Sequence, residues 1–311
     1  MITRPFGKTG INVPAVGLGT WNIGGQWGEV SDLESDAIIR TAIASGMRLI
    51  DTAESYGIPN GTSELRISRV LHEFDREELV LVSKIGHWGK RTGQEVPKTT
   101  ADLIRLCGHA IAGRLKTDYV DTILCHDGGI QDPTIYIEGF EKLVEDGFLR
   151  NYGISTNSLE VLKTFQDISG GKCAVVELEY SLLNRSTEED IIPYCQQEGI
   201  GILVRGPLRK GILSGRYDLK SVFTDSVRSS WNRDGEKRGE YEELIRQFED
   251  IRQVIGEADL IETALRFIIT HPANMVVIPG ATTTSQVESN AAAGADRLDP
   301  DLYEKLLDLK F

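Results

Sequence analysis

Short apolar runs alternate with amphipathic segments along the whole chain, and this alternation constrains the fold more than any other feature. Strands that alternate with helices form parallel sheets. Eight such repeats within 311 residues favour one α/β domain over residues 1–311, closed as a (β/α)8 TIM barrel, with a doubly wound open sheet as the alternative. The runs expected to be buried strands are 16–19, 49–51, 79–83, 119–124, 152–155, 175–178, 201–204 and 275–278.

Two common nucleotide-binding motifs are absent from the chain. An open Rossmann sheet would carry the pattern G-x-G-x-x-G directly after a strand. Gly17 and Gly19 begin this pattern, but its third glycine is missing, and there is no Walker A sequence. A nucleotide site on this chain must therefore use different contacts, which weakens the open-sheet alternative.

Local signals mark the first helix and a hairpin that precedes the barrel. Ser31 followed by Glu34 is a capping box, and Gly46 ends the same helix. Apolar runs at 2–6 and 11–13 flank a glycine-containing turn, which is typical of a β-hairpin. We expect this N-terminal β-hairpin to close the bottom of the barrel.

The charge and cysteine content restrict the partners and the compartment. The net charge of −13 disfavours nucleic acid or an anionic membrane as a partner, but it allows a small anionic ligand held by a local cluster of donors. Four widely spaced cysteines without a CxxC pair favour buried thiols in a reducing cytosol over disulfides or a metal site. We expect a cytoplasmic protein without a signal peptide or membrane span, acting on a small molecule; the oligomeric state stays open.

Titratable side chains end three consecutive predicted strands. In a (β/α)8 barrel, the chemistry is carried by the C-terminal ends of the strands, and here these ends bring Asp51, Lys84 and His126, with Tyr56 five residues after Asp51. The Lys84 ammonium would lower the pKa of Tyr56, and Asp51 would keep Lys84 protonated. With His126 hydrogen-bonding near the phenol oxygen, this set predicts a tuned proton donor beside a substrate carbonyl.

Each of these residues also has a plainer interpretation. A Lys or Asp at a strand end is often a solvated rim residue, a single His is often a core residue, and Tyr56 alone would be a packing residue. Their joint placement is what indicates a site. Lys84 could instead form a Schiff base, as in barrel aldolases and isomerases, although a neighbouring Asp51 argues against this. We expect no metal, because His126 lies in no recognised ligand spacing.

Six motifs occur in the order found in the aldo-keto reductases, and the chain resembles this family over nearly its whole length. They are G-L-G-T-W (17–21), D-T-A-E-S-Y-G (51–57), V-S-K (82–84), G-I-S (153–155), E-Y-S-L-L (179–183) and V-I-P-G-A (277–281). The resemblance implies a (β/α)8 barrel that reduces aldehydes and ketones to alcohols, or catalyses the reverse, with NADPH or less often NADH. It implies Tyr56 as the general acid, Lys84 and Asp51 as its tuning pair, and His126 as the residue that orients the substrate.

The resemblance also implies a nicotinamide cofactor site spread over the barrel. NADP(H) is favoured, because members of this family use NADPH more often than NADH. NAD(H) is the alternative, because Thr282 and Gln286 stand where relatives that prefer NADPH carry a cation. Asn157 follows one place after the position of the usual asparagine and is expected to substitute for it. The expected cofactor contacts are Thr20, Trp21, Asp51, Ser155, Thr156, Glu177, Arg205, Gly206, Pro207, Leu208, Gly211, Pro279, Gly280, Ala281, Thr282, Gln286 and Asn290.

Two of these positions depart from the family pattern. Glu177 replaces the glutamine that usually holds the carboxamide, and Arg205 replaces an aromatic ring that usually stacks on the nicotinamide. Because they end neighbouring predicted strands, we expect Glu177 and Arg205 to form an ion pair beside the nicotinamide. The alternative is that the two positions changed independently and that their side chains do not interact.

The substrate pocket is expected to contain tryptophans and His126. Trp27, Trp88 and Trp231 are the candidates, and tryptophan rings suit the flat faces of sugars or aromatics. The sequence Asp127-Gly128-Gly129 stands where many relatives carry a bulky apolar residue, which predicts a roomier, polar pocket. We expect a sugar or keto-sugar, while Arg205 would suit an anionic substrate. A regulatory subunit that binds cofactor with little turnover is a further alternative.

Overall fold

Eight parallel strands form the central sheet of the computed structural model, which describes residues 1–311. In chain order they are β3 (Leu18–Gly19), β4 (Leu49–Asp51), β5 (Val80–Ile85), β6 (Val120–Cys125), β7 (Leu149–Ser155), β8 (Val175–Glu179), β9 (Gly201–Arg205) and β10 (Val276–Val277). Isolated parallel bridges join Val16 to Val277 and Gly19 to Gly280, so the first strand meets the last. The eight predicted strands and the (β/α)8 barrel are therefore confirmed.

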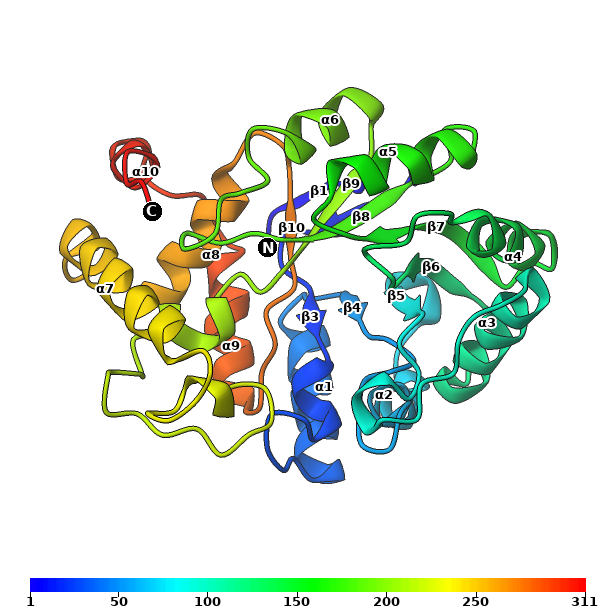
Figure 1. Ribbon diagram of the computed structural model, residues 1–311, viewed down its shortest axis with the longest axis horizontal. Helices are drawn as coiled ribbons and strands as arrows, with labels where there is room; N and C mark the ends of the chain where they lie inside the picture. Colours follow the sequence, from blue (N-terminus) through cyan, green and yellow to red (C-terminus); the bar gives the residue numbers. More distant parts are fainter.

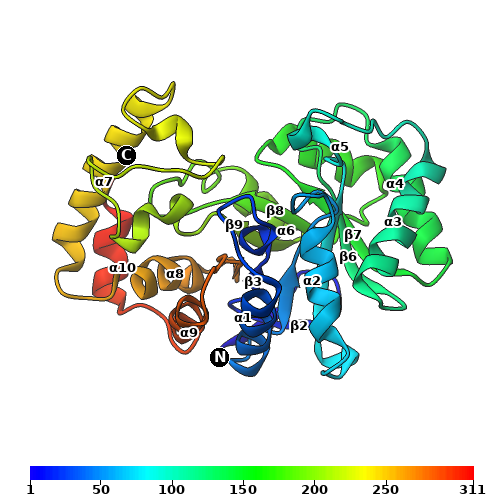
Figure 2. The same ribbon diagram turned by 90° about the horizontal axis from the view of Figure 1, so that it is seen from below.

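One helix follows each strand of the barrel. These helices are α1 (Asp32–Ala44), α2 (Thr62–Leu71), α3 (Ala101–Leu115), α4 (Thr134–Glu145), α5 (Leu159–Ile168), α6 (Ile191–Glu198), α8 (Leu260–Thr270) and α9 (Thr284–Ala293). They surround the sheet, while two additional helices, α7 (Arg238–Ile255) and α10 (Pro300–Leu307), pack against each other and against α8 on one side (Figures 1 and 2). The segment between β9 and α7 is the longest connection and carries the short 3-10 helices η4 (Arg209–Ser214) and η5 (Ser229–Trp231).

An antiparallel hairpin of β1 (Thr3–Pro5) and β2 (Asn12–Pro14) closes the end of the barrel opposite the strand C-termini. Phe6 and Val13 of this hairpin are fully buried in one cluster with apolar side chains from inside the barrel. Close packing continues at the turn, where a Cβ on Gly7 would lie 2.1 Å from the backbone nitrogen of Gly201. The predicted hairpin at the bottom of the barrel is confirmed.

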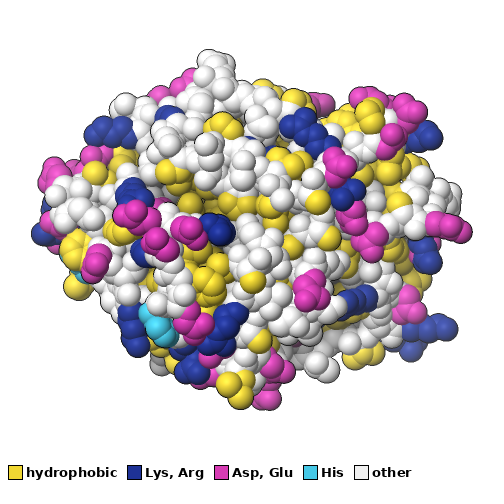
Figure 3. Space-filling view, turned by 180° about the vertical axis from the view of Figure 1, so that it is seen from behind, with side chains coloured by type: hydrophobic (Ala, Val, Ile, Leu, Met, Phe, Trp, Pro, Cys, Tyr) yellow, Lys and Arg dark blue, Asp and Glu magenta, His cyan; other side chains and the backbone are white.

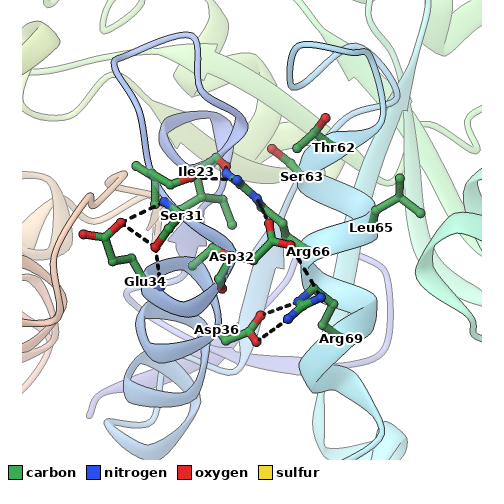
Figure 4. Close-up of polar contacts among 12 residues, drawn as sticks. Ile23, Ser31, Asp32, Glu34, Asp36, Thr62, Ser63, Leu65, Arg66 and Arg69 are labelled. Atoms are coloured by element: carbon green, nitrogen blue, oxygen red, sulfur yellow. Dashed lines mark hydrogen bonds and ion pairs between the residues drawn. The ribbon is translucent and has the colours of Figure 1, made fainter.

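The loop after β3, which carries the 3-10 helix η1 (Trp21–Gly24), is held against α2 by Arg66 (Figure 4). The Arg66 guanidinium donates to the carbonyl oxygens of Ile23 and of Val30, the latter at 2.6 Å, and forms an ion pair with Asp32 at 3.1 Å. Because these bonds join α1, α2 and the η1 loop, they fix the backbone that presents Trp21.

The N-terminus of α1 has the predicted capping box, also visible in Figure 4. The Ser31 hydroxyl accepts from the Glu34 amide at 3.2 Å, and the Glu34 carboxylate accepts from the Ser31 amide at 2.7 Å. Replacing Ser31 with alanine leaves the Glu34 amide without this acceptor, so we expect the free energy of unfolding to fall by about 1 kcal/mol. Urea denaturation followed by circular dichroism measures this, with Ser31→Thr as the control that keeps the hydroxyl. An unchanged denaturation midpoint for Ser31→Ala would contradict the expectation.

The surface of the molecule carries mixed charges. Figure 3 shows acidic and basic side chains interspersed over the face opposite to the view of Figure 1. None of the helices is both long enough and apolar enough to serve as a membrane span.

Candidate active site

A cavity of about 650 Å³ opens at the C-terminal ends of the strands. Most of the predicted site residues line it: Trp21, Trp27, Asp51, Tyr56, His126, Ser155, Thr156, Asn157, Glu177, Arg205, Gly206, Pro207, Leu208, Gly211, Pro279, Gly280, Thr282, Gln286 and Asn290. Thr20 and Ala281 are buried behind this wall, and the Thr20 hydroxyl donates to the backbone oxygen of Asp51 at 2.8 Å. Lys84 is also fully buried, directly beneath the cavity.

The Lys84 ammonium group lies at the centre of a buried polar cluster. Its Nζ atom lies 2.5 Å from the Asp51 carboxylate, 2.9 Å from the backbone oxygen of Thr52 and 3.3 Å from the hydroxyl of Tyr56. A second carboxylate, that of Glu177, is 3.0 Å away. Lys84 therefore contacts Tyr56 and two acidic side chains at once.

Strand register and side-chain length bring this cluster together. Asp51 is the last residue of β4 and pairs with Val82, so Lys84 lies two residues further along β5 and reaches back to Asp51. Glu177 lies on β8, which is not a neighbour of β5, so the Lys84 side chain spans the inside of the barrel to reach it. Only a long side chain can make this contact, which explains why a lysine occupies the position.

The phenol of Tyr56 keeps its proton more firmly than the sequence suggested. Burial raises the pKa of Tyr56 to about 12, and the negative charges of Asp51 and Glu177 add to the rise, while the Lys84 ammonium opposes it. The expected net lowering of the Tyr56 pKa is therefore wrong for the free protein. The prediction failed because it counted the charge of Lys84 but neither the burial of the Tyr56 side chain nor the second carboxylate, that of Glu177.

The charges beneath Tyr56 do not balance. Burial disfavours a charged Lys84, but the Asp51 and Glu177 carboxylates outweigh it and raise the pKa of Lys84. Burial also raises the pKa of Asp51 well above its usual range, against the attraction of Lys84. One ammonium between two buried carboxylates leaves one negative charge uncompensated, so Lys84 stays protonated and Asp51 tends to retain a proton.

His126 faces Tyr56 as a neutral side chain. The two ring centroids are 6.0 Å apart, in an edge-to-face arrangement. Burial lowers the pKa of His126 well below its usual range, and the nearby His87, Lys84 and Arg91 add to this effect. A neutral imidazole offers one hydrogen-bond donor and one acceptor to a ligand rather than a positive charge.

His87 is a cavity residue that the sequence reasoning missed. It follows β5 by two residues, and its ring centroid is 4.3 Å from that of His126. Burial lowers its pKa to about 4, with the charges of Lys90 and Arg91 adding to the effect. Its place directly after a strand end was a signal that could have revealed it, as it did for His126.

The predicted ion pair between Glu177 and Arg205 does not form. Arg205 contacts the Glu179 carboxylate at 3.0 Å and the Asn157 amide oxygen at 3.0 Å, while Glu177 contacts Lys84. Strand register explains the difference, because Glu179 lies directly opposite Arg205, whereas Glu177 lies opposite Leu203. Both glutamates lie on the same face of β8, and the sequence alone could not show which of them meets Arg205.

Of the three predicted pocket tryptophans, only Trp27 lines the cavity. Trp88 packs beside α3, where the Arg114 guanidinium lies 5.1 Å from its ring centroid. Trp231 is almost completely buried and stacks on Tyr241 at 5.3 Å. The predictions for Trp88 and Trp231 are therefore wrong, because the direction in which these side chains leave their loops is set by packing.

The cavity wall has features that suit an elongated polar ligand. Gly206 and Gly211 adopt positive φ angles of 66° and 94° in the segment after β9. A Cβ on Gly280 would lie 1.8 Å from the Asn22 side-chain oxygen, so a larger residue there would displace the wall. The amide nitrogen of Asn290 lines the cavity, is buried, and has no hydrogen-bond partner within the protein. These glycines and the unpartnered amide fit a ligand such as a nicotinamide dinucleotide.

Comparisons with known proteins agree with this geometry. A sequence model of the aldo/keto reductase family matches residues 15–309. The chain is 29% identical to the aldo-keto reductase YhdN of Bacillus subtilis (strain 168), over 90% of this chain and 85% of that protein. It is 26% identical to the NADH-specific methylglyoxal reductase of Escherichia coli (strain K12), over 93% and 92% of the two chains. A solved aldo/keto reductase of Klebsiella pneumoniae, in complex with NADP and acetate, is similar with a TM-score of 0.72 and 29% identity, over 98% and 93%.

Proposed function

The chain belongs to the aldo/keto reductase family, and from this premise we propose that it reduces an aldehyde or ketone to the alcohol, or catalyses the reverse, with Tyr56 as the general acid and base. The observation that carries the proposal is the placement of the Tyr56 hydroxyl. It lies at the cavity wall, 3.3 Å from the buried Lys84 ammonium, in the position that a proton donor to a bound carbonyl oxygen needs.

The chain's own residues supply the proton and the binding site. The reduced nicotinamide, when bound, supplies the hydride that goes to the carbonyl carbon. Tyr56 donates its proton to the carbonyl oxygen, and Lys84, held by Asp51 and Glu177, stabilises the phenolate that remains. His126, neutral and beside Tyr56, gives the same oxygen a second hydrogen bond and so orients the carbonyl.

We favour NADP(H) as the cofactor, with NAD(H) as the alternative. Ser155 and Glu177 would hold the carboxamide end of the cofactor, and the segment from Gly206 to Gly211 would hold its diphosphate. Lys210, on this segment, and Arg216, which follows it, line the cavity and have no carboxylate within 4 Å, so their charges are available for phosphate groups. Around the N-terminus of α9, Gln286 accepts from the Thr282 amide at 2.8 Å, and neither side chain offers a cation.

The aldolase or isomerase alternative requires an uncharged Lys84. A Schiff base forms only from the free amine, and the contacts with Asp51 and Glu177 keep Lys84 protonated. The complete set of Asp51, Tyr56, Lys84 and His126 at one end of the cavity argues against a regulatory subunit with little turnover. Neither alternative gains support from any contact in the cavity.

A sugar or keto-sugar remains the substrate proposed from the sequence. The cavity is polar around Gly128, where a Cβ would lie 2.7 Å from the backbone oxygen of Ser155, so a side chain could not be added there without displacing backbone. Gly128 therefore allows the backbone to pack closely at this part of the cavity wall, beside His126 and Thr156.

Cofactor titration followed by a carbonyl panel tests the proposed function. We expect NADPH, and more weakly NADH, to quench the tryptophan fluorescence, because Trp21 and Trp27 line the cavity. The cofactor that binds more tightly is then used with aldehydes, ketones, aldoses, keto-sugars and 2-oxo acids. Saturable quenching together with turnover of at least one carbonyl supports the proposal, and an absence of turnover over the whole panel contradicts it.

The two directions of the reaction should differ in their pH dependence. Reduction needs protonated Tyr56, and a pKa of about 12 keeps this form dominant through the neutral range. Oxidation needs the phenolate, whose population rises about tenfold for each pH unit below that pKa. We therefore expect log kcat/KM for alcohol oxidation to rise with pH between 6 and 9 (~ one unit per pH unit), while that for reduction stays level. Steady-state pH profiles measure this, and a level oxidation profile would contradict it.

A further inference from the structure

The walls of the cavity are basic, although the protein as a whole is acidic. Six basic residues line it, which are Arg91, Arg205, Arg209, Lys210, Arg216 and Arg228, against the three acidic residues Asp51, Glu177 and Glu179. The chain itself has a net charge of −13. A local excess of positive charge inside such a protein attracts an anionic ligand.

Three of the six basic residues on the wall form ion pairs with carboxylates of the protein. Arg205 and Arg209 share the Glu179 carboxylate, and Arg228 forms an ion pair with Asp225 at 2.8 Å. Arg205 is therefore not available for the anionic substrate that the sequence had suggested. Three cations have no carboxylate within 4 Å, and these are Arg91, Lys210 and Arg216.

Of these three, only Arg91 is placed at the Tyr56 end of the cavity. Lys210 and Arg216 belong to the segment after β9 that we assign to the cofactor phosphates. Arg91 lies on η3 (Lys90–Thr92) after β5, and its guanidinium carbon is 4.4 Å from the ring centroid of Trp21 and 5.9 Å from that of Tyr56. An anionic group beside Arg91 would thus lie close to a carbonyl that accepts the proton of Tyr56.

The surroundings of Arg91 orient its guanidinium without satisfying its charge. The Trp21 ring stacks on it, and its only hydrogen-bond partner is the neutral side-chain oxygen of Gln26, at 3.5 Å. His87 and His126 on the neighbouring wall are neutral, so neither competes for an anion. A planar guanidinium held flat in this way matches the two oxygens of a carboxylate.

We propose that the substrate is a carbonyl compound with a carboxylate close to the reacting carbon, such as a 2-oxo acid, and that Arg91 binds this carboxylate. This inference rests on the proposed function. In the reaction, hydride from the reduced nicotinamide forms the new C–H bond, and the Tyr56 proton forms the O–H bond of the resulting hydroxy acid. The oxidised cofactor is released, Tyr56 regains a proton from solvent, and the carboxylate is unchanged.

Pyruvate and its neutral methyl ester form a matched pair of substrates for the test. The ratio of their kcat/KM values cancels any effect of a substitution on folding or on cofactor binding. We expect Arg91→Leu to lower the acid-to-ester ratio by about 10- to 100-fold, mainly through a higher KM for pyruvate. Arg91→Lys keeps the charge but loses the planar fork, so its ratio should lie between those of Arg91→Leu and the wild type.

Lys90 supplies the matched control. It is exposed on the same 3-10 turn and does not line the cavity, so Lys90→Leu removes one positive charge without touching the proposed contact. The acid-to-ester ratio should be unchanged in this variant. If the ratio falls equally in Lys90→Leu and Arg91→Leu, only the overall positive potential of the cavity matters. That result would overturn the proposed direct contact between Arg91 and the substrate carboxylate.

Binding without turnover gives an independent readout. Oxamate has the shape and charge of pyruvate but is not reduced, and oxamide is its neutral counterpart. With cofactor present, we expect oxamate to change the tryptophan fluorescence of the wild type, and to do so far less in Arg91→Leu. Oxamide should have little effect on either protein. Equal binding of oxamate to the two proteins, or none to the wild type, overturns the inference.

The remaining outcomes separate this inference from the proposed function. If the wild type reduces methyl pyruvate and other neutral carbonyls but not pyruvate, the carboxylate site is wrong and the reductase stands. If Arg91→Leu lowers the rates with acid and ester alike, Arg91 acts on Trp21 or Tyr56 and not on the substrate. If no carbonyl compound is reduced with either cofactor, the proposed function itself fails.

Discussion

Replacing Tyr56 with phenylalanine should lower kcat/KM for carbonyl reduction by about 10²- to 10⁴-fold. The substitution removes one oxygen and leaves the aromatic ring, which packs at 6.0 Å from both Trp21 and His126. The lost oxygen is the hydroxyl at the cavity wall that contacts the Lys84 ammonium, at 3.3 Å. Steady-state kinetics with a saturating cofactor measures the loss.

Cofactor binding should survive this substitution, because the affinity depends on other walls of the cavity. The dissociation constant from fluorescence titration should therefore change little. Tyr119→Phe is the matched control, since it also removes a buried tyrosine hydroxyl, but one that lies outside the cavity. Retained reduction by Tyr56→Phe would contradict the assignment of Tyr56 as the proton donor, whereas equal losses in both variants would point to a packing effect.

Replacing Lys84 with methionine should cost both activity and stability. Two buried carboxylates, those of Asp51 and Glu177, lose the one cation that both contact. Removing one partner of a buried charge cluster typically costs about 3–5 kcal/mol of folding free energy. Without the ammonium, the Tyr56 phenolate is also harder to form, so the rate of reduction should fall as well.

The stability loss should depend on pH in a defined direction. In Lys84→Met, burial and the negative charge of Glu177 hold the pKa of Asp51 above its value in the unfolded chain, without the opposing Lys84 charge. The folded state then binds more protons than the unfolded state, so its stability falls as pH rises and recovers as pH is lowered. Chemical denaturation between pH 5 and 8 should therefore show the largest deficit, relative to the wild type, at the upper end of this range.

Two further variants control this prediction. Lys98→Met breaks another buried ion pair, with Glu54 at 3.1 Å, and Lys98 does not line the cavity. It should lose stability while the chemistry at Tyr56 continues. Lys84→Met combined with Asp51→Asn and Glu177→Gln removes all three charges and should regain much of the lost stability. A triple variant no more stable than Lys84→Met would contradict the charge explanation.

Local sequence patterns were sufficient to predict the framework of the barrel. Apolar runs have to be buried wherever they occur, and their alternation with amphipathic segments allows few arrangements of the chain. Strand ends in a parallel barrel all meet at one rim, so Asp51, Lys84 and His126 could be placed near one another without knowing any side-chain contact. The capping box at Ser31 is equally local, because its partners are three residues apart.

The contacts inside the site were decided by the tertiary structure. Lys84 meets Glu177 across the barrel, and Arg205 meets Glu179 because of a register that no local pattern encodes. The burial that raises the pKa of Tyr56 likewise depends on every segment packed around it. A sequence records which residues are near along the chain, while partner choice, register and exclusion of water depend on distances through space. The fold and the rim residues could therefore be predicted, but the balance of charge beneath Tyr56 could not.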